Sequence, residues 1–209
     1  MIPAAEALKR LQAGNTRFVA DRPRTSAITN QTRREELVTG QSPFAVILGC
    51  SDSRVPAEVV FDQGLGDLFV VRVAGNITAP SQVESVEFAA GQLGVRLVVV
   101  LGHSHCGAIQ ATLQAMTRPA SDCSPSPRSI VDRIRPALEP ILAADRELDA
   151  DALVEQAVRA NIRAGVARLR DDSDTLRNLI AEDGLQIVGA EYALESGEVE
   201  FFGDLPRES

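Results

Sequence analysis

The chain has 209 residues, enough for one ample α/β domain. With 44% hydrophobic and 24% charged residues it is not disordered, collagen-like or a coiled coil. Its net charge of −8 argues against nucleic acid and anionic membranes as partners, because both are bound through clustered positive charge. We find no apolar run of about 18 residues and no signal-peptide pattern, and therefore expect a soluble, cytoplasmic protein.

The first part of the chain is predicted to form a helical arm. Apolar residues recur at helical spacing over residues 3–13, and Gly14 and Asn15 are expected to end this helix. Residues 20–42 are polar and irregular, with one short helix predicted over 32–38.

Three short, β-branched apolar runs follow, at residues 44–49, 68–73 and 96–102. Such runs are typical of strands buried on both faces. A helical pattern after Pro80 separates the second run from the third, and this alternation predicts a parallel sheet.

The second half of the chain is predicted to be mainly helical before it ends in a hairpin. Pro136 and Pro140 interrupt one helical pattern, so we expect a bend or two short helices there. The helices are predicted over residues 106–116, 128–144, 152–169 and 175–181, and the hairpin strands over 185–194 and 199–202. No internal boundary is evident, so we expect one domain over 1–209, with an arm at 1–42 and a core at 43–209.

Two of the predicted strands end in residues suited to chemistry. The first runs into Cys50, Asp52 and Arg54, and the third runs into His103 and Cys106. Residues just past the carboxyl ends of parallel strands line the crevice where ligands bind. Both clusters are therefore expected to face one crevice.

Tetrahedral Zn²⁺ is bound by thiolates, imidazoles and carboxylates. The two clusters offer four such groups: the thiolates of Cys50 and Cys106, the imidazole of His103 and the carboxylate of Asp52. The nearby Arg54 leaves two arrangements of this site open. If Asp52 binds zinc, four protein ligands fill the coordination sphere and the site is closed. If Asp52 pairs with Arg54 instead, the fourth coordination position is open for water.

The sequence contains one more histidine and one more cysteine besides these candidate ligands. His105 is either a polar neighbour of the ligands or a proton shuttle. Cys123 lies in a polar loop, and we expect no metal role for it.

The sequence resembles the β-class carbonic anhydrases. The resemblance rests on CSDSRV from Cys50 and GHSHCGA from Gly102, with support at residues 66–72 and 85–89, and it reaches the final hairpin.

The resemblance implies a zinc lyase that hydrates CO2 reversibly to bicarbonate and a proton. One zinc per chain would be held by Cys50, His103 and Cys106, and zinc-bound hydroxide would attack CO2. Asp52 and Arg54 would form the family's catalytic pair, with Asp52 binding zinc only in a closed, inactive state.

It also implies a sheet of order 2-1-3-4 extended by a fifth strand, and a homodimer or homotetramer. Gln41 would reach the partner subunit's site. The apolar wall for CO2 would consist of Val55, Phe69 and Phe88, although many members carry tyrosine where this chain has Phe88.

Two other functions fit the same ligand residues. The first is hydrolysis of carbonyl sulfide or carbon disulfide on the same scaffold, which sulfide release would reveal. The second is a non-catalytic zinc protein in which Asp52 permanently completes the site; Asp52→Asn would then lose zinc. A thiol redox role is disfavoured because the chain lacks a Cys-x-x-Cys pair.

Overall fold

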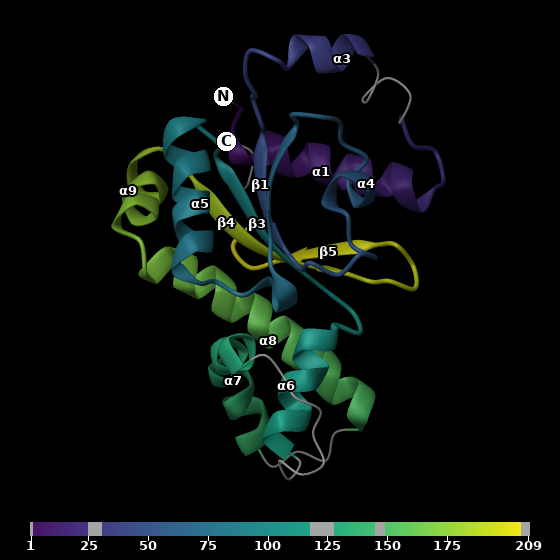
Figure 1. The fold of residues 1–209 in the computed structure, drawn as a ribbon, viewed down its shortest axis with the longest axis vertical. Coiled ribbons are helices and arrows are strands. Elements are labelled where there is room, and N and C mark those ends of the chain that lie inside the picture. The colour runs from purple at the N-terminus through teal and green to yellow at the C-terminus, as the bar shows by residue number, and fades with distance from the viewer. Residues whose placement is uncertain (1, 25–30, 118–127, 145–148, 206–209) are drawn as a thin grey trace.

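The computed structural model describes residues 2–24, 31–117, 128–144 and 149–205. A five-stranded sheet of order β2-β1-β3-β4-β5 crosses the molecule (Figure 1). Its strands are β1 (Ala45–Gly49), β2 (Leu68–Arg72), β3 (Leu97–His103), β4 (Gln186–Tyr192) and β5 (Val199–Phe202). The first four are parallel and β5 is antiparallel, which confirms the expected order and the terminal hairpin.

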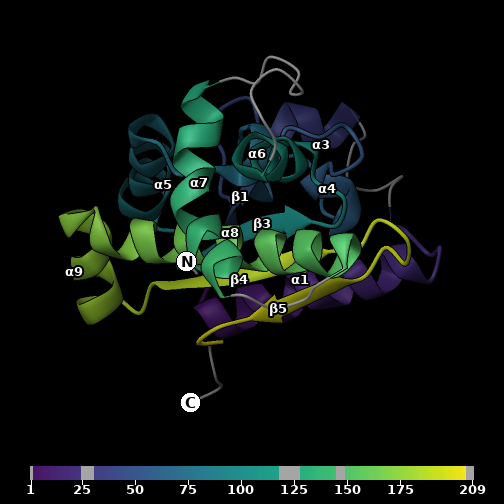
Figure 2. The same cartoon turned by 90° about the horizontal axis from the view of Figure 1, so that it is seen from below.

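Helices cover both faces of this sheet, as Figure 2 shows from below. On one face lie α1 (Ala4–Val19) and α4 (Ala57–Val60). On the other face lie α5 (Pro80–Gln92) and α8 (Ala150–Asp171), and α9 (Asp174–Glu182) packs against both of these helices. The helices α6 (Gly107–Thr117) and α7 (Arg128–Ala143) pack against α8 beyond the end of the sheet (Figure 1). The short helices α3 (Gln31–Glu36) and η1 (Ala74–Asn76) complete the described elements.

The alternation of side chains along the strands divides the core into two clusters. In β1, Val46 and Leu48 pack in the cluster beneath α5 and α8, whereas Ala45 and Ile47 pack in the cluster beneath α1. Every residue of β1 and β3 is buried, as expected for central parallel strands.

The prediction that both faces of the second strand are buried is wrong. In β2 only Leu68 and Val71 are buried, and Arg72 is exposed. The strand lies at the edge of the sheet, so helices of this chain cover it incompletely.

The prediction that Gly14 and Asn15 end the first helix is also wrong, because α1 continues to Val19. A β-carbon at Gly14 would lie 1.7 Å from the carbonyl oxygen of Phe61, so the glycine serves close packing rather than termination. Asn15 donates to the carbonyls of Val60 and Gly197. Tertiary contacts thus outweigh local helix propensity.

Of the two arrangements expected around Pro136 and Pro140, a bend or two short helices, the second does not occur, because α7 is one helix. Both prolines lie on the exposed side, where water can satisfy the carbonyls that lose an amide partner. The buried residues Val131, Ile134 and Leu138 hold the opposite side against the core.

Two further observations concern the chain as a whole. No helix among the described residues is long and apolar enough to cross a membrane. Cys123 lies outside the described residues, so its expected lack of a metal role stays a prediction.

Candidate active site

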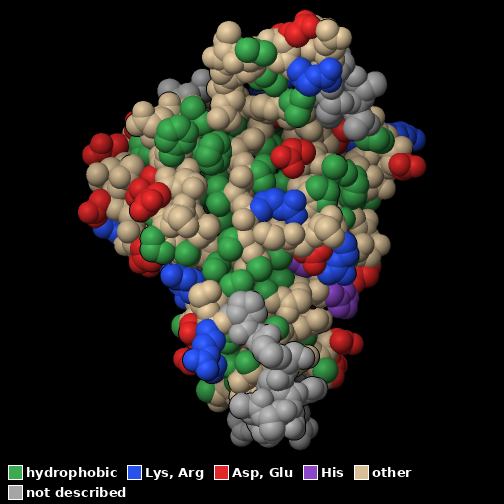
Figure 3. All heavy atoms as spheres, viewed as in Figure 1, with side chains coloured by type: hydrophobic (Ala, Val, Ile, Leu, Met, Phe, Trp, Pro, Cys, Tyr) green, Lys and Arg blue, Asp and Glu red, His purple; other side chains and the backbone are tan. Residues whose placement is uncertain are grey.

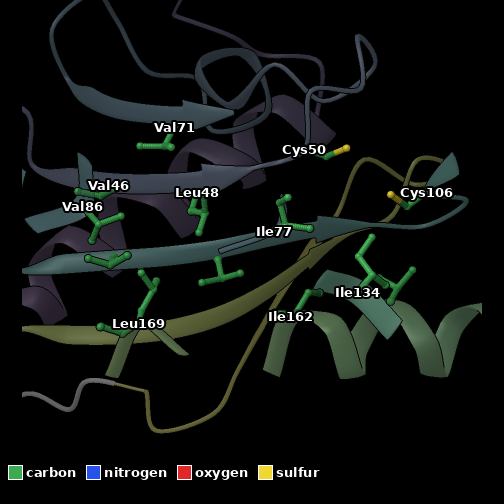
Figure 4. Packing of buried hydrophobic residues seen from close by; sticks show 14 of the residues in the cluster. Val46, Leu48, Cys50, Val71, Ile77, Val86, Cys106, Ile134, Ile162 and Leu169 are labelled. Atoms are coloured by element: carbon green, nitrogen blue, oxygen red, sulfur yellow. The ribbon is translucent and has the colours of Figure 1, made fainter. Parts of the chain in front are cut away.

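Cys50, His103 and Cys106 meet at the carboxyl edge of the sheet. Cys50 follows β1, His103 ends β3, and Cys106 precedes α6. One donor atom from each residue lies within 4.8 Å of the others, and all three side chains are buried. Figure 4 shows the two sulfur atoms at the same end of the sheet. This cluster is the predicted sulfur and nitrogen site.

The imidazole of His103 is oriented as a metal ligand requires. Its Nδ1 lies 2.8 Å from the carbonyl oxygen of Ser104, which makes Nδ1 the protonated nitrogen. Its Nε2 is buried and makes no hydrogen bond with the described residues. An unpartnered basic nitrogen beside two thiols fits a zinc ion, and these three ligands leave a fourth coordination position.

The sulfur atoms of Cys50 and Cys106 lie close together. The neighbouring Cys106 thiol lowers the pKa of Cys50 to about 4 despite the opposing effect of burial. The proximity of Cys50, together with burial, raises the pKa of Cys106. A metal cation would favour the thiolate form of both residues, because thiolates are the form that binds metal.

Asp52 is turned toward Arg54. Arg54 Nε donates to Oδ1 at 2.9 Å and Nη2 donates to Oδ2 at 2.7 Å, and this pair holds the pKa of Asp52 well below its usual range. Asp52 Oδ2 nevertheless lies only 3.8 Å from His103 Nε2. The carboxylate therefore borders the three candidate ligands while both of its oxygens are engaged by Arg54.

Arg72 holds the segment that carries these residues. Its Nε donates to the carbonyl of Cys50 at 3.0 Å, and its Nη2 donates to the carbonyl of Asp52 at 2.6 Å. Sequence reasoning did not assign this contact, because it depends on the pairing of β1 with β2. The signal available in the sequence was an arginine at the end of an apolar strand, within the stretch at residues 66–72 that supports the family resemblance.

His105 lies on the outer side of the ligand loop. Its ring is exposed, and Nε2 is 2.6 Å from Glu195 Oε1. His105 and Glu195 line a cavity of about 600 Å³ between α8 and the β4–β5 hairpin. This cavity is rich in carboxylates, such as those of Glu191 and Glu200.

The expected pocket residues lie in different surroundings within a single chain. Phe69 and Phe88 pack together with ring centroids 6.2 Å apart, and Phe88 is 50% exposed. Val55 is buried in the cluster beneath α1. Gln41 is exposed and precedes β1.

Fold and site together define a class: an α/β protein with a cluster of two cysteines and a histidine, suited to a metal ion, at the carboxyl edge of a parallel sheet. Residues 45–199 match the carbonic anhydrase family model. Carbonic anhydrase 2 of Mycobacterium tuberculosis is 41% identical over 194 residues, which cover 91% of this chain and 89% of that protein.

Two other proteins support the same assignment. A carbonic anhydrase of Mycolicibacterium smegmatis is 40% identical, over 93% of this chain and 91% of its own. The crystal structure of an Aspergillus fumigatus β-carbonic anhydrase superposes with a TM-score of 0.73 at 26% identity, over 96% of this chain and 92% of its own. The chain therefore belongs to the β-class carbonic anhydrase family of enzymes.

Proposed function

We propose that the protein hydrates CO2 reversibly to bicarbonate and a proton, with one Zn²⁺ held by Cys50, His103 and Cys106. The observation that carries this proposal is the pairing of both Asp52 oxygens with Arg54. With Asp52 engaged in this way, the chain offers three protein ligands, as catalytic zinc sites do, rather than the four of a structural site.

In this reaction Asp52 and Arg54 have different roles, which complement that of the metal ion. When bound, Zn²⁺ supplies the Lewis acidity that makes hydroxide available near neutral pH. Asp52 would accept a hydrogen bond from the nucleophile and so fix its orientation toward CO2. Arg54 keeps Asp52 ionised and holds it away from Cys50, His103 and Cys106. Asp52 would bind the metal itself only in a closed, inactive state.

We propose a homodimer, or a dimer of such dimers, as the functional unit, with each 209-residue chain forming one domain. Large apolar side chains stay exposed on this chain, among them Phe88 at 50%, Val59 at 54% and Leu65 at 41%. Figure 3 shows hydrophobic side chains across the centre of one face. A second subunit packed against this chain would bury such apolar surface and bring Gln41 to the partner's site, where we place the CO2 pocket of Val55, Phe69 and Phe88.

We propose the cytoplasm as the compartment. The two described cysteines are free thiols that face each other, and such thiols persist in a reducing environment.

Stopped-flow CO2 hydration between pH 6 and 9, with zinc measured on the same sample, tests the proposal. We expect about one zinc per chain and activity that rises with pH as hydroxide becomes available. A zinc-loaded protein inactive even at pH 9 would overturn it. Sulfide release from carbonyl sulfide or carbon disulfide without CO2 hydration would assign the alternative hydrolase.

A further inference from the structure

A backbone amide points at the sulfur of Cys50. The N–H of Gly75, in the short helix η1, donates to Cys50 Sγ at 3.3 Å, and the contact is buried. A hydrogen bond to sulfur restricts the direction from which that sulfur can be approached. The position of Gly75 therefore bears directly on how Cys50 presents its sulfur.

Gly75 occupies a conformation and a space that suit glycine alone. Its φ of 68° lies in the left-handed region. A β-carbon there would lie 2.8 Å from Ile134 Cδ1 and 3.0 Å from Ala108 Cβ. Packing restricts the space around this turn, but a polar contact is needed to fix the rotation of its peptide groups.

Asn161 on α8 supplies that contact. Its Nδ2 donates to the Gly75 carbonyl at 2.9 Å, and the residue is only 4% exposed. The next residue, Ile162, packs against Gly102, because a β-carbon at Gly102 would lie 2.6 Å from Ile162 Cδ1. One stretch of α8 thus braces the turn beside Cys50 and the strand that ends at His103.

We propose that Asn161 is a positioning residue for Cys50, acting through the peptide groups of Gly75. The side-chain amide holds the Gly75 carbonyl, and the Gly75 amide in turn holds the Cys50 sulfur. Asn161 touches neither the candidate metal position nor the substrate. This inference rests on the proposed zinc site.

The test compares Asn161→Asp with a matched control, Asn15→Asp. Asn15 is also buried, at 7% exposure, and its Nδ2 also donates to backbone carbonyls, but it lies in the other core cluster beside Val60 and Gly197. Both substitutions keep the shape of the side chain and remove the donor. The alanine variants of both positions provide a second pair should an aspartate prevent folding.

Three measurements are made on each variant: thermal unfolding of the metal-free protein, zinc affinity by competition with a chelating indicator, and the thiolate-to-metal absorption of the Co²⁺ form. We expect both substitutions to lower the unfolding temperature. Only the change at residue 161 should weaken zinc binding, by about 10- to 100-fold, and shift the cobalt absorption.

These measurements distinguish a failure of the positioning role of Asn161 from a failure of the proposed zinc site. Equal zinc affinities and cobalt spectra for the variants at residues 161 and 15 would overturn the positioning role and leave the proposed function standing. A wild-type protein that binds no zinc would overturn the proposed function itself.

Discussion

In the proposed mechanism, Asp52 has to stay ionised beside three candidate metal ligands without joining them, and Arg54 meets both requirements. Asp52→Asn keeps the size of the side chain but places an amide where the carboxylate accepts hydrogen bonds. We expect CO2 hydration to fall by about 10²- to 10³-fold, because the amide is a weaker acceptor than the carboxylate and leaves Arg54 only one oxygen to pair with, while about one zinc per chain is retained. Stopped-flow rates and metal analysis on the same sample check this. Loss of zinc would instead indicate that Asp52 completes a structural site.

The residues nearest the chemistry could be predicted because they are close in sequence. Cys50, Asp52 and Arg54 span five positions, and His103 and Cys106 span four, so short motifs at two strand ends contain them all. The link between Asn161 and Gly75 joins residues 86 positions apart, and no local pattern indicates it. Such a contact exists only once α8 has packed against the sheet.

At the scale of elements, Glu191 on β4 is a buried carboxylate facing Arg159 on α8. Its Oε2 lies 2.7 Å from Arg159 Nε, yet burial outweighs this attraction and raises the pKa of Glu191. A carboxyl group whose pKa is raised by folding favours the folded state below its unfolded pKa, and this contribution is lost as pH rises through the folded pKa.

Glu191→Gln should therefore gain stability relative to wild type as pH rises from about 4 toward 7. Urea unfolding of both metal-free proteins across this interval measures the difference. A difference independent of pH would show that Arg159 compensates fully for the burial of Glu191.

The single helix α7 shows how far packing can override a sequence rule. Pro136→Ala restores an amide that can donate to the carbonyl of residue 132, on the exposed side of the helix. We expect a gain of about 1 to 2 kcal/mol in the free energy of unfolding. Pro80→Ala is the matched control, because Pro80 begins α5, where the missing amide costs no hydrogen bond, and no gain is expected. Urea unfolding of both variants distinguishes the two positions.

Hydrophobic periodicity predicted the helices and the parallel strands, and the resemblance to the β-class carbonic anhydrases supplied the strand order. The departures described above depend on contacts that local periodicity does not show. Gly14 reads as a helix terminator until the carbonyl of Phe61 is placed against it. The apolar run of β2 reads as a fully buried strand, whereas its position at the sheet edge leaves Phe69 and Val70 partly exposed. A hydrophobic sequence pattern identifies an apolar surface, but it does not indicate whether the same chain or another chain covers that surface.

For the whole molecule, that uncovered edge leads to a test of where the active site is completed. If Gln41 serves the partner's site, Gln41→Ala and Asp52→Asn should each be nearly inactive as homodimers. A dimer with one subunit of each kind keeps one intact site, because the Gln41 of the Asp52→Asn subunit reaches the unaltered Asp52 of the other.

Differently tagged variants are refolded together in equal amounts, and CO2 hydration is measured by stopped flow. Random pairing makes about half of the dimers mixed, each with one working site of two, so recovery to about a quarter of wild-type activity is expected. Refolding each variant alone is the control and should restore nothing. If Gln41 acts within its own subunit, the mixture would stay inactive too, because every site would then lack either the glutamine or the carboxylate.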